Sequence, residues 1–396
     1  MSSAGTSTAP DDETRLLRDA RLVPRIDMSL PRTEIARQVR AAADGGGPGF
    51  FYLVNHGIGA AVLERAVAET HAFFRSGESK KMEVSSLARF GRWGVKGYNA
   101  PGVEGAYEKD ALTDVRPDDE AASGALNTRE AYVLRYPEMS DFFKDAQKGE
   151  DLPPPGDVAE AARLFYAPNP WPISRHREKN HFKSTVLRYC DAMRTVADAM
   201  FGVFEEAMLH ATADKDLCIP HDEGMTTFNL ARYGREDFDA GTFGISDHTD
   251  WEMFTLLYPC FYNPAVGVCD KDGKMMPGSG GARPTAGVPV PIETVNFTGL
   301  EAWYEDRWMA VPHISGSIIL NQGEMLSRMS GGRFKAPVHR VRANTEGQER
   351  YSLVSFWGPN YEFLLPNNGG GLGKGAQSSN AGVLAGEYYL RRSALL

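Results

Sequence analysis

The chain has 396 residues and carries 43 basic against 52 acidic side chains, a formal net charge of −9. This length corresponds to two or three average domains, or to one large domain, because β-sandwiches and β-barrels often exceed the average. Apolar residues make up 42% and charged residues 24%, a globular composition that excludes a disordered or fibrous chain. The acidic excess disfavours a nucleic acid or an anionic membrane as a partner. No run approaches the roughly 18 consecutive apolar residues of a membrane span.

The four cysteines and the N-terminal segment indicate the cellular compartment. The cysteines are scattered and form no CxxC pair, so neither a disulfide framework nor a zinc ribbon is predicted. Free thiols are typical of a reducing compartment. Residues 1–20 lack the apolar core of a secretory signal, and their early acidic residues are atypical of a transit peptide. We therefore expect a cytoplasmic protein that begins with a flexible tail over residues 1–20.

The first half of the chain has a mostly helical pattern. Apolar residues recur at steps of three or four in three segments, which predicts helices at 33–43, 60–75 and 173–210. Shorter aromatic and β-branched runs predict strands at 23–27, 50–54 and 130–134. A helix is also expected at the C-terminus, over 376–396.

The pattern changes after residue 222 to short β-type runs separated by glycine, proline and asparagine. The expected strands are 226–233, 254–258, 317–320, 333–341 and 351–357. Such spacing indicates a β-sandwich or barrel. Residues 259–298 interrupt it with an unusually long loop, of the kind that often serves as a lid. We expect one domain over 21–396, with a mostly helical part at 21–220 and a β core at 221–360. No βαβ rhythm, GxGxxG or P-loop is present, so a nucleotide-binding fold is disfavoured.

One group of side chains has the composition of a metal site. In His248-Thr249-Asp250, residues i and i+2 of a strand project to the same face, so an imidazole and a carboxylate can point together. His339, on a later predicted strand, can supply a third ligand. Two histidines and one carboxylate form the facial triad of non-haem Fe(II) oxygenases. An HxD triplet alone is common by chance, and the other histidines are interpreted as structural or surface side chains.

A second group follows eleven residues after His339. Arg350 and Ser352 share one strand face, where a guanidinium can bind a carboxylate bidentately and a hydroxyl adds a donor. This pair suits a dicarboxylate whose other end chelates the metal. A surface salt bridge is the alternative for Arg350, but the apolar residues that follow it disfavour this.

These residues belong to a longer series of matching blocks, at 23–27, 49–58, 169–172, 248–250, 299–324, 337–341 and 350–352. In this order and spacing the sequence resembles the Fe(II)/2-oxoglutarate-dependent dioxygenases related to isopenicillin N synthase. The resemblance covers roughly residues 20–395, and four separate regions carry it. It implies an α+β, mainly β fold: a distorted double-stranded β-helix, or jelly-roll, with flanking helices.

The resemblance also implies roles for individual residues. Fe(II) is expected on His248, Asp250 and His339, with the remaining positions for 2-oxoglutarate and O2. The far carboxylate of 2-oxoglutarate is expected on Arg350, Ser352 and Tyr233, although Gly234 replaces the proline that usually follows the tyrosine. Candidates for the substrate pocket are Asn229, Trp251 and Phe356, each of which can alternatively be a packing residue. Halogenation is disfavoured, because halogenases of this type are expected to lack the carboxylate ligand.

The expected activity is oxidation of an unactivated C–H bond of a small molecule, by hydroxylation, desaturation or oxidative cyclisation, in specialised metabolism. 2-Oxoglutarate would be converted to succinate and CO2. The segments 104–168 and 259–298 are longer than in the family and lie where relatives cover the substrate, so we expect them to carry specificity. The protein is expected to act as a monomer, without a nucleic acid or a membrane as partner.

Two alternatives remain open on the sequence. One is an oxidase of the isopenicillin N synthase kind, which uses no 2-oxoglutarate and applies the same arginine and serine to the carboxylate of its substrate. The other is a non-catalytic jelly-roll binding protein. Succinate formation separates the first alternative from the dioxygenase, and metal binding separates the second.

Overall fold

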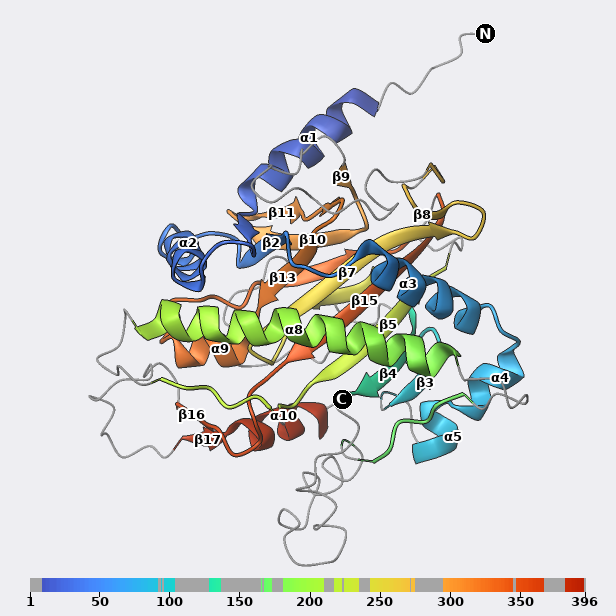
Figure 1. Cartoon of the computed structure of the whole chain (residues 1–396). Coiled ribbons are helices and arrows are strands. Elements are labelled where there is room, and N and C mark those ends of the chain that lie inside the picture. The colour runs from blue at the N-terminus through green and yellow to red at the C-terminus, as the bar shows by residue number, and fades with distance from the viewer. Residues whose placement is uncertain are drawn as a thin grey trace, which may run out of the picture.

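The computed structural model describes most of the chain (Figure 1). The described residues are 9–91, 94, 96–103, 128–136, 165, 167–172, 181–209, 217–222, 224–234, 243–270, 272–274, 295–344, 347–366 and 382–394. Most of the expected 104–168 insertion, residues 275–294 of the second one and residues 173–180 of the long helix lie outside them. In the part of the chain that the structure describes, no helix is long and apolar enough to cross a membrane.

A nine-stranded sheet forms the centre of the molecule. Its order is β1-β2-β13-β7-β15-β5-β4-β3, with β8 beside β7. The strands are β1 Arg25–Asp27, β2 Phe50–Val54, β3 Gly97–Asn99, β4 Glu130–Arg135, β5 Thr227–Tyr233, β7 Phe254–Asn263, β8 Gly267–Cys269, β13 Ile318–Gln322 and β15 Glu349–Trp357. All neighbours are antiparallel except β1 and β2. Strands from the helical first half therefore extend both edges of a sheet whose centre comes from the second half.

A second sheet, of four strands, faces the first. Its order is β11-β10-β14-β6, with β6 Phe243–His248, β10 Leu300–Tyr304, β11 Arg307–Ala310 and β14 His339–Arg342. Two-stranded pairs complete the β structure: β9 Val295–Asn296 with β12 His313–Ile314, and β16 Leu364–Leu365 with β17 Val383–Leu384. Inward-facing apolar side chains of the two large sheets, among them Ala231, Leu257, Leu300 and Val341, pack in one buried cluster. This is the sandwiched core predicted for a jelly-roll.

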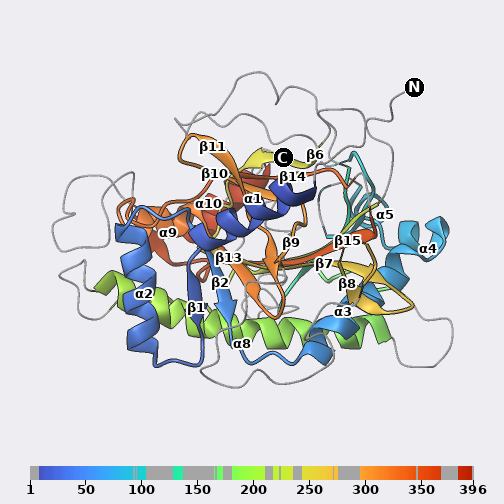
Figure 2. The same ribbon diagram turned by 90° about the horizontal axis from the view of Figure 1, so that it is seen from above.

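Helices cover the other face of the large sheet (Figure 2). The long helix α8, His181–Leu209, lies across the strands, flanked by α2 Arg32–Asp44 and α3 Ala60–Phe74. Its predicted apolar stripe is buried, at Phe182, Val186, Tyr189, Met193, Val196 and Met200. Tyr189 also donates a hydrogen bond of 3.1 Å to the carbonyl of Leu353 in β15, which ties the helix to the centre of the sheet.

Shorter helices lie at the periphery: α4 Glu78–Glu83, α5 Ser86–Phe90, α9 Glu324–Met329 and the C-terminal α10 Ala385–Ala394. The C-terminal helix is thus confirmed within the described residues, at 385–394 of the expected 376–396.

The flexible tail expected over residues 1–20 is wrong for residues 9–20. They form most of helix α1, Ala9–Leu22, which lies against β11 and β9. The side chain of Asp19 is fully buried, where its carboxylate accepts hydrogen bonds from Arg307 (2.9 Å) and from the backbone N–H of Ala310 (3.1 Å). A contact with a strand almost 300 residues away stabilises this helix, and a local pattern cannot reveal it.

Two strand boundaries also differ from the prediction. The loop expected from residue 259 is in part a hairpin, because β7 continues to Asn263 and turns into β8. Pro259 suggested a strand end because it lacks an N–H. Conversely, the strand expected over 333–341 begins only at His339, after Pro337.

Candidate metal centre and co-substrate site

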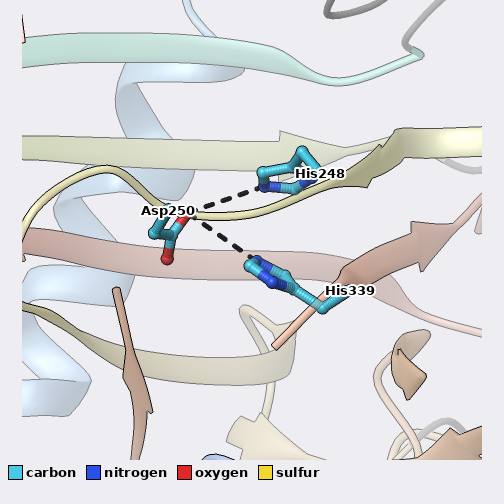
Figure 3. A group of neighbouring side chains, drawn as sticks. All are labelled: His248, Asp250 and His339. Atoms are coloured by element: carbon cyan, nitrogen blue, oxygen red, sulfur yellow. Dashed lines mark ion pairs between the residues drawn. The ribbon is translucent and has the colours of Figure 1, made fainter. Parts of the chain in front are cut away.

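The three predicted metal ligands lie together (Figure 3). His248 ends β6 and pairs in register with His339, the first residue of β14, and Asp250 follows two residues after His248. One ligand atom from each residue lies within 4.8 Å of the other two. Oδ1 of Asp250 is 3.7 Å from Nε2 of each imidazole. A pair of adjacent strands and the loop that follows one of them therefore bring together donors that are 91 residues apart in the chain.

Backbone carbonyls fix the tautomers of both imidazoles. Nδ1 of His248 lies 2.8 Å from the carbonyl oxygen of Ser246, and Nδ1 of His339 lies 3.0 Å from that of Pro337. A carbonyl oxygen only accepts, so each Nδ1 carries a proton, which leaves Nε2 as the ring nitrogen that faces Asp250 and can bind a metal ion. Burial lowers the pKa of His248 below its ordinary value, and the neighbouring His339 lowers it further. Neutral imidazoles are the form that binds a metal ion.

The carboxylate of Asp250 is held in one orientation. Its Oδ2 accepts hydrogen bonds from Nδ2 of Asn321 (2.7 Å, β13) and from the hydroxyl of Thr255 (β7). Both bonds fall on Oδ2, which leaves Oδ1 toward the imidazoles. Burial raises the pKa of Asp250, but the two imidazoles and these hydrogen bonds outweigh burial and lower it. A carboxylate with a lowered pKa, held beside two imidazole Nε2 atoms, fits a divalent first-row transition metal.

The loop between the ligands is attached to the C-terminal helix. Oε1 of Glu324, at the start of α9, accepts a hydrogen bond of 2.5 Å from Thr249, the residue between His248 and Asp250. The same carboxylate accepts two bonds from Arg392 of α10, at 2.6 and 2.7 Å, and one from the hydroxyl of Tyr388. One half-buried carboxylate thus connects α10 to the metal-ligand loop.

Arg350 is buried in the same interior, at a distance along β15. It is 2% exposed, and its Nη2 donates to the carbonyl of Arg342 at 2.9 Å. Its Nε is buried without a hydrogen-bond partner, and burial lowers its pKa to about 10. Within the described residues no carboxylate forms an ion pair with it. A desolvated cation without an acidic partner fits an anionic group supplied by a ligand.

The surroundings of Arg350 are shaped for its guanidinium. Its Cζ lies 4.0 Å from the ring centroid of Tyr233, the residue opposite it in β5. Gly299 has a φ of +84°, and a Cβ at this position would overlap Nη1 of Arg350. A Cβ at Gly244 would lie 2.7 Å from the ring of Tyr233. Both glycines therefore leave space that the arginine and the tyrosine fill.

Two family models match separate parts of the chain. Residues 292–359 match the 2OG-Fe(II) oxygenase superfamily, and residues 23–172 match the N-terminal region of the non-haem dioxygenases in morphine synthesis. The chain belongs to the 2OG-Fe(II) oxygenase superfamily. It is an Fe(II)- and 2-oxoglutarate-dependent dioxygenase.

Relatives that are named as dioxygenases match most of this chain. The 2-oxoglutarate-dependent dioxygenase thnC of Trichoderma harzianum is 25% identical over 329 residues, which cover 82% of this chain and 78% of thnC. The dioxygenase tropC of Talaromyces stipitatus is 23% identical and covers 88% of this chain and 90% of tropC. The crystal structure of a full-length Neurospora crassa protein in complex with 2-oxoglutarate has a TM-score of 0.61 at 21% identity, over 94% and 96% of the two chains. At that identity the structural likeness supports the fold.

The other residues predicted to bind the co-substrate or the substrate differ in burial and in their neighbours. Ser352 is 6% exposed, two residues from Arg350 on the same face of β15. Phe356 is half-buried on that face and pairs with Thr255. Asn229 is 6% exposed, and its Oδ1 is buried without a partner among the described residues. The ring of Trp251 packs against Tyr389 of α10, at 6.0 Å between centroids, which supports packing as its role.

Several residues that contact the site were not predicted from the sequence. They are Thr255, Asn321, Gly299, Glu324 and Arg392. Asn321 and Glu324 stand in a block that resembles the family, which was the available signal, but the block assigns them no role. Thr255 and Asn321 acquire theirs because β7 pairs with β13, where the two residues lie opposite each other.

Proposed function

We propose that His248, Asp250 and His339 hold Fe(II), and that Arg350 binds the far carboxylate of 2-oxoglutarate with Ser352 and Tyr233. The enzyme would use this site to oxidise an unactivated C–H bond of a small molecule. The observation that supports it most is the pairing of two features in one interior: three convergent metal donors, and one buried arginine that has no acidic partner among the described residues.

The chain's own groups have distinct tasks in this proposal. When bound, iron and 2-oxoglutarate supply the oxidising power, with O2 as oxidant and succinate and CO2 as products. Asn321 and Thr255 orient Asp250, while the backbone carbonyls hold both imidazoles with Nε2 toward the metal position. Arg350 neutralises and orients the far carboxylate, and the apolar walls of the two sheets exclude water. The protein thus contributes binding, orientation and exclusion.

The names of the relatives support a substrate class. One relative, 22% identical over 325 residues, is named kihadalactone A synthase, from Citrus sinensis. Such a name supports a small organic substrate in specialised metabolism, oxidised by hydroxylation, desaturation or cyclisation. We further propose a cytoplasmic monomer without nucleic-acid or membrane partners, in keeping with the net charge of −9.

Succinate formation and iron content test the proposal. The purified enzyme should bind one Fe(II) per chain and convert 2-oxoglutarate to succinate. His339→Ala should lose the iron, whereas the control His181→Ala, at an exposed histidine, should keep it. Oxygen consumption without succinate would instead indicate the oxidase that uses no 2-oxoglutarate. Unchanged iron affinity in His339→Ala would remove this residue from the site.

A further inference from the structure

Asn229 places a carboxamide on the inner face of β5. Its neighbours at the next inward positions, Ala231 and Tyr233, belong to the apolar cluster between the two sheets, and alternation puts Asn229 on the same face. Across the ladder it lies opposite Val354 in β15 and Val133 in β4. A polar side chain therefore stands among apolar cross-strand neighbours.

This carboxamide lacks the contacts that other buried asparagines have. It is 6% exposed, and nothing among the described residues donates to its Oδ1. Asn169, 7% exposed, by contrast bonds the backbone N–H of Arg135 at 2.9 Å and its carbonyl at 2.8 Å. Asn321 donates to Asp250. Buried polar groups are almost always paired, so an exception in an enzyme interior points to a ligand.

The register places Asn229 between the metal centre and the anion site. Thr255, which bonds Asp250, lies two strands away and one inward position along. Strand spacing then gives a Cα separation of about 12 Å. Tyr233, beside Arg350, lies four residues along β5, about 13 Å away. A ligand group that bonds Asn229 would therefore lie between the metal ligands and Arg350, and the tests below separate a substrate from the co-substrate.

We propose that Asn229 is a substrate-recognition residue that hydrogen-bonds a hydroxyl group of a mostly apolar small molecule. A hydroxyl suits the carboxamide because it donates to Oδ1 and accepts from Nδ2. Val133, Val354 and the half-buried Phe356 would contact the apolar part of the same molecule. The inference rests on the proposed function and adds to it the kind of substrate that the pocket takes.

The first test compares Asn229→Leu with the matched control Asn169→Leu. Leucine is close to asparagine in size and removes only the polar atoms. Because Asn229 has no partner within the described chain, its variant should keep or raise the melting temperature. Asn169→Leu leaves two backbone groups unpaired and should lower the melting temperature by roughly 2–5 °C. An equal fall in Asn229→Leu would show a structural role and overturn the proposal.

The second test measures recognition directly. Hydroxylated small natural compounds are each paired with their O-methyl ethers, and succinate formation above the level without compound is recorded. In the wild type, kcat/KM should favour the free hydroxyl by about tenfold, and in Asn229→Leu this preference should fall toward one. A preference that persists in the variant overturns the proposal. So does a rise of more than about fivefold in the KM for 2-oxoglutarate, which would assign the carboxamide to the co-substrate. Absence of any succinate in the wild type would instead contradict the proposed function.

Discussion

Asp250 and Arg350 lie in the same interior, but their charged groups differ in the contacts that the described residues make with them. The carboxylate of Asp250 receives hydrogen bonds from Asn321 and Thr255 and faces two imidazoles. The guanidinium of Arg350 is equally buried, yet it has one backbone acceptor, an aromatic ring and an orphaned Nε. The protein itself orients the carboxylate of Asp250, whereas the guanidinium of Arg350 has no acidic partner among the described residues.

This contrast separates a resident ligand from a co-substrate. A metal ligand must be aligned before the metal arrives, because a misoriented carboxylate loses affinity. A buried charge without a partner costs several kcal/mol, which binding of an anion can offset. We therefore expect affinity for 2-oxoglutarate to come from Arg350, which has no acidic partner among the described residues.

The largest effect is expected at the oriented carboxylate. Asp250→Ala removes the one negative ligand and should lower iron binding and succinate formation by at least about 1,000-fold. Metal content and succinate rate measure it. Asp44→Asn, at an exposed carboxylate that pairs with Arg333, is the control. Retention of stoichiometric iron in Asp250→Ala would contradict the assigned centre.

Arg350→Met tests the other side of the comparison. Loss of the bidentate contact should raise the KM for 2-oxoglutarate by about 10- to 100-fold. Stability without 2-oxoglutarate should not fall, because the variant also removes an uncompensated buried charge. Calorimetric melting and steady-state kinetics give both quantities. A strongly destabilised variant with an unchanged KM would mean that Arg350 is structural.

Asn321→Leu and Thr255→Val remove the orientation while leaving the ligands in place. Each should weaken iron affinity by about tenfold and leave the KM for 2-oxoglutarate within about twofold, since neither residue contacts Arg350. Ser355→Ala, a buried hydroxyl of β15 that bonds the carbonyl of Leu256, serves as control. Equal iron affinity in all three variants would show that the orientation contributes nothing.

A smaller effect is expected at the connection to α10. Arg392→Met removes the cation that holds the carboxylate of Glu324. Glu324 should then hold Thr249 less firmly, so iron affinity should fall about two- to fivefold. Arg392→Lys should restore part of it. Titration of the apoprotein with Fe(II) is the measurement, and melting temperature serves to detect general loss of packing. Lost stability with unchanged iron affinity would reduce the contact to a structural one.

The smallest effect is expected at His313, a buried histidine outside the metal centre. Burial lowers the pKa of His313 to about 4, against about 6.5 in the unfolded chain. Between these values the unfolded state binds more protons, so stability falls as the pH falls through this window. From pH 7 to pH 6 the share of His313 in this loss should be about 0.7 kcal/mol. The total loss should therefore be smaller by that amount in His313→Gln, in which the other buried histidines still contribute. Denaturant unfolding at both pH values checks it.

Part of the site could be predicted from local pattern. His248 and Asp250 share a face because they stand two residues apart, and His339 begins a later strand. Orientation could not be predicted in this way. Asn321 reaches Asp250 only because β13 pairs with β7 in one register, and Arg392 reaches Glu324 across 68 residues. Such contacts depend on which strands and helices become neighbours, which no sequence spacing encodes.

The sequence by itself determined the chemistry of the ligands, their order and the apolar stripe of α8, because residue types and periodicity express these directly. The oxygenase class came from the resemblance of its motifs to a known family. Tertiary structure alone decided which charges are completed. Among the described residues, it buried Arg350 without an acidic partner and Asn229 without a donor to its Oδ1. It also gave Asp250 two donors on one oxygen and attached the helix of residues 9–20 to β11 through Asp19. Desolvation and pairing are properties of packed neighbours, and neighbours exist only once the chain has folded.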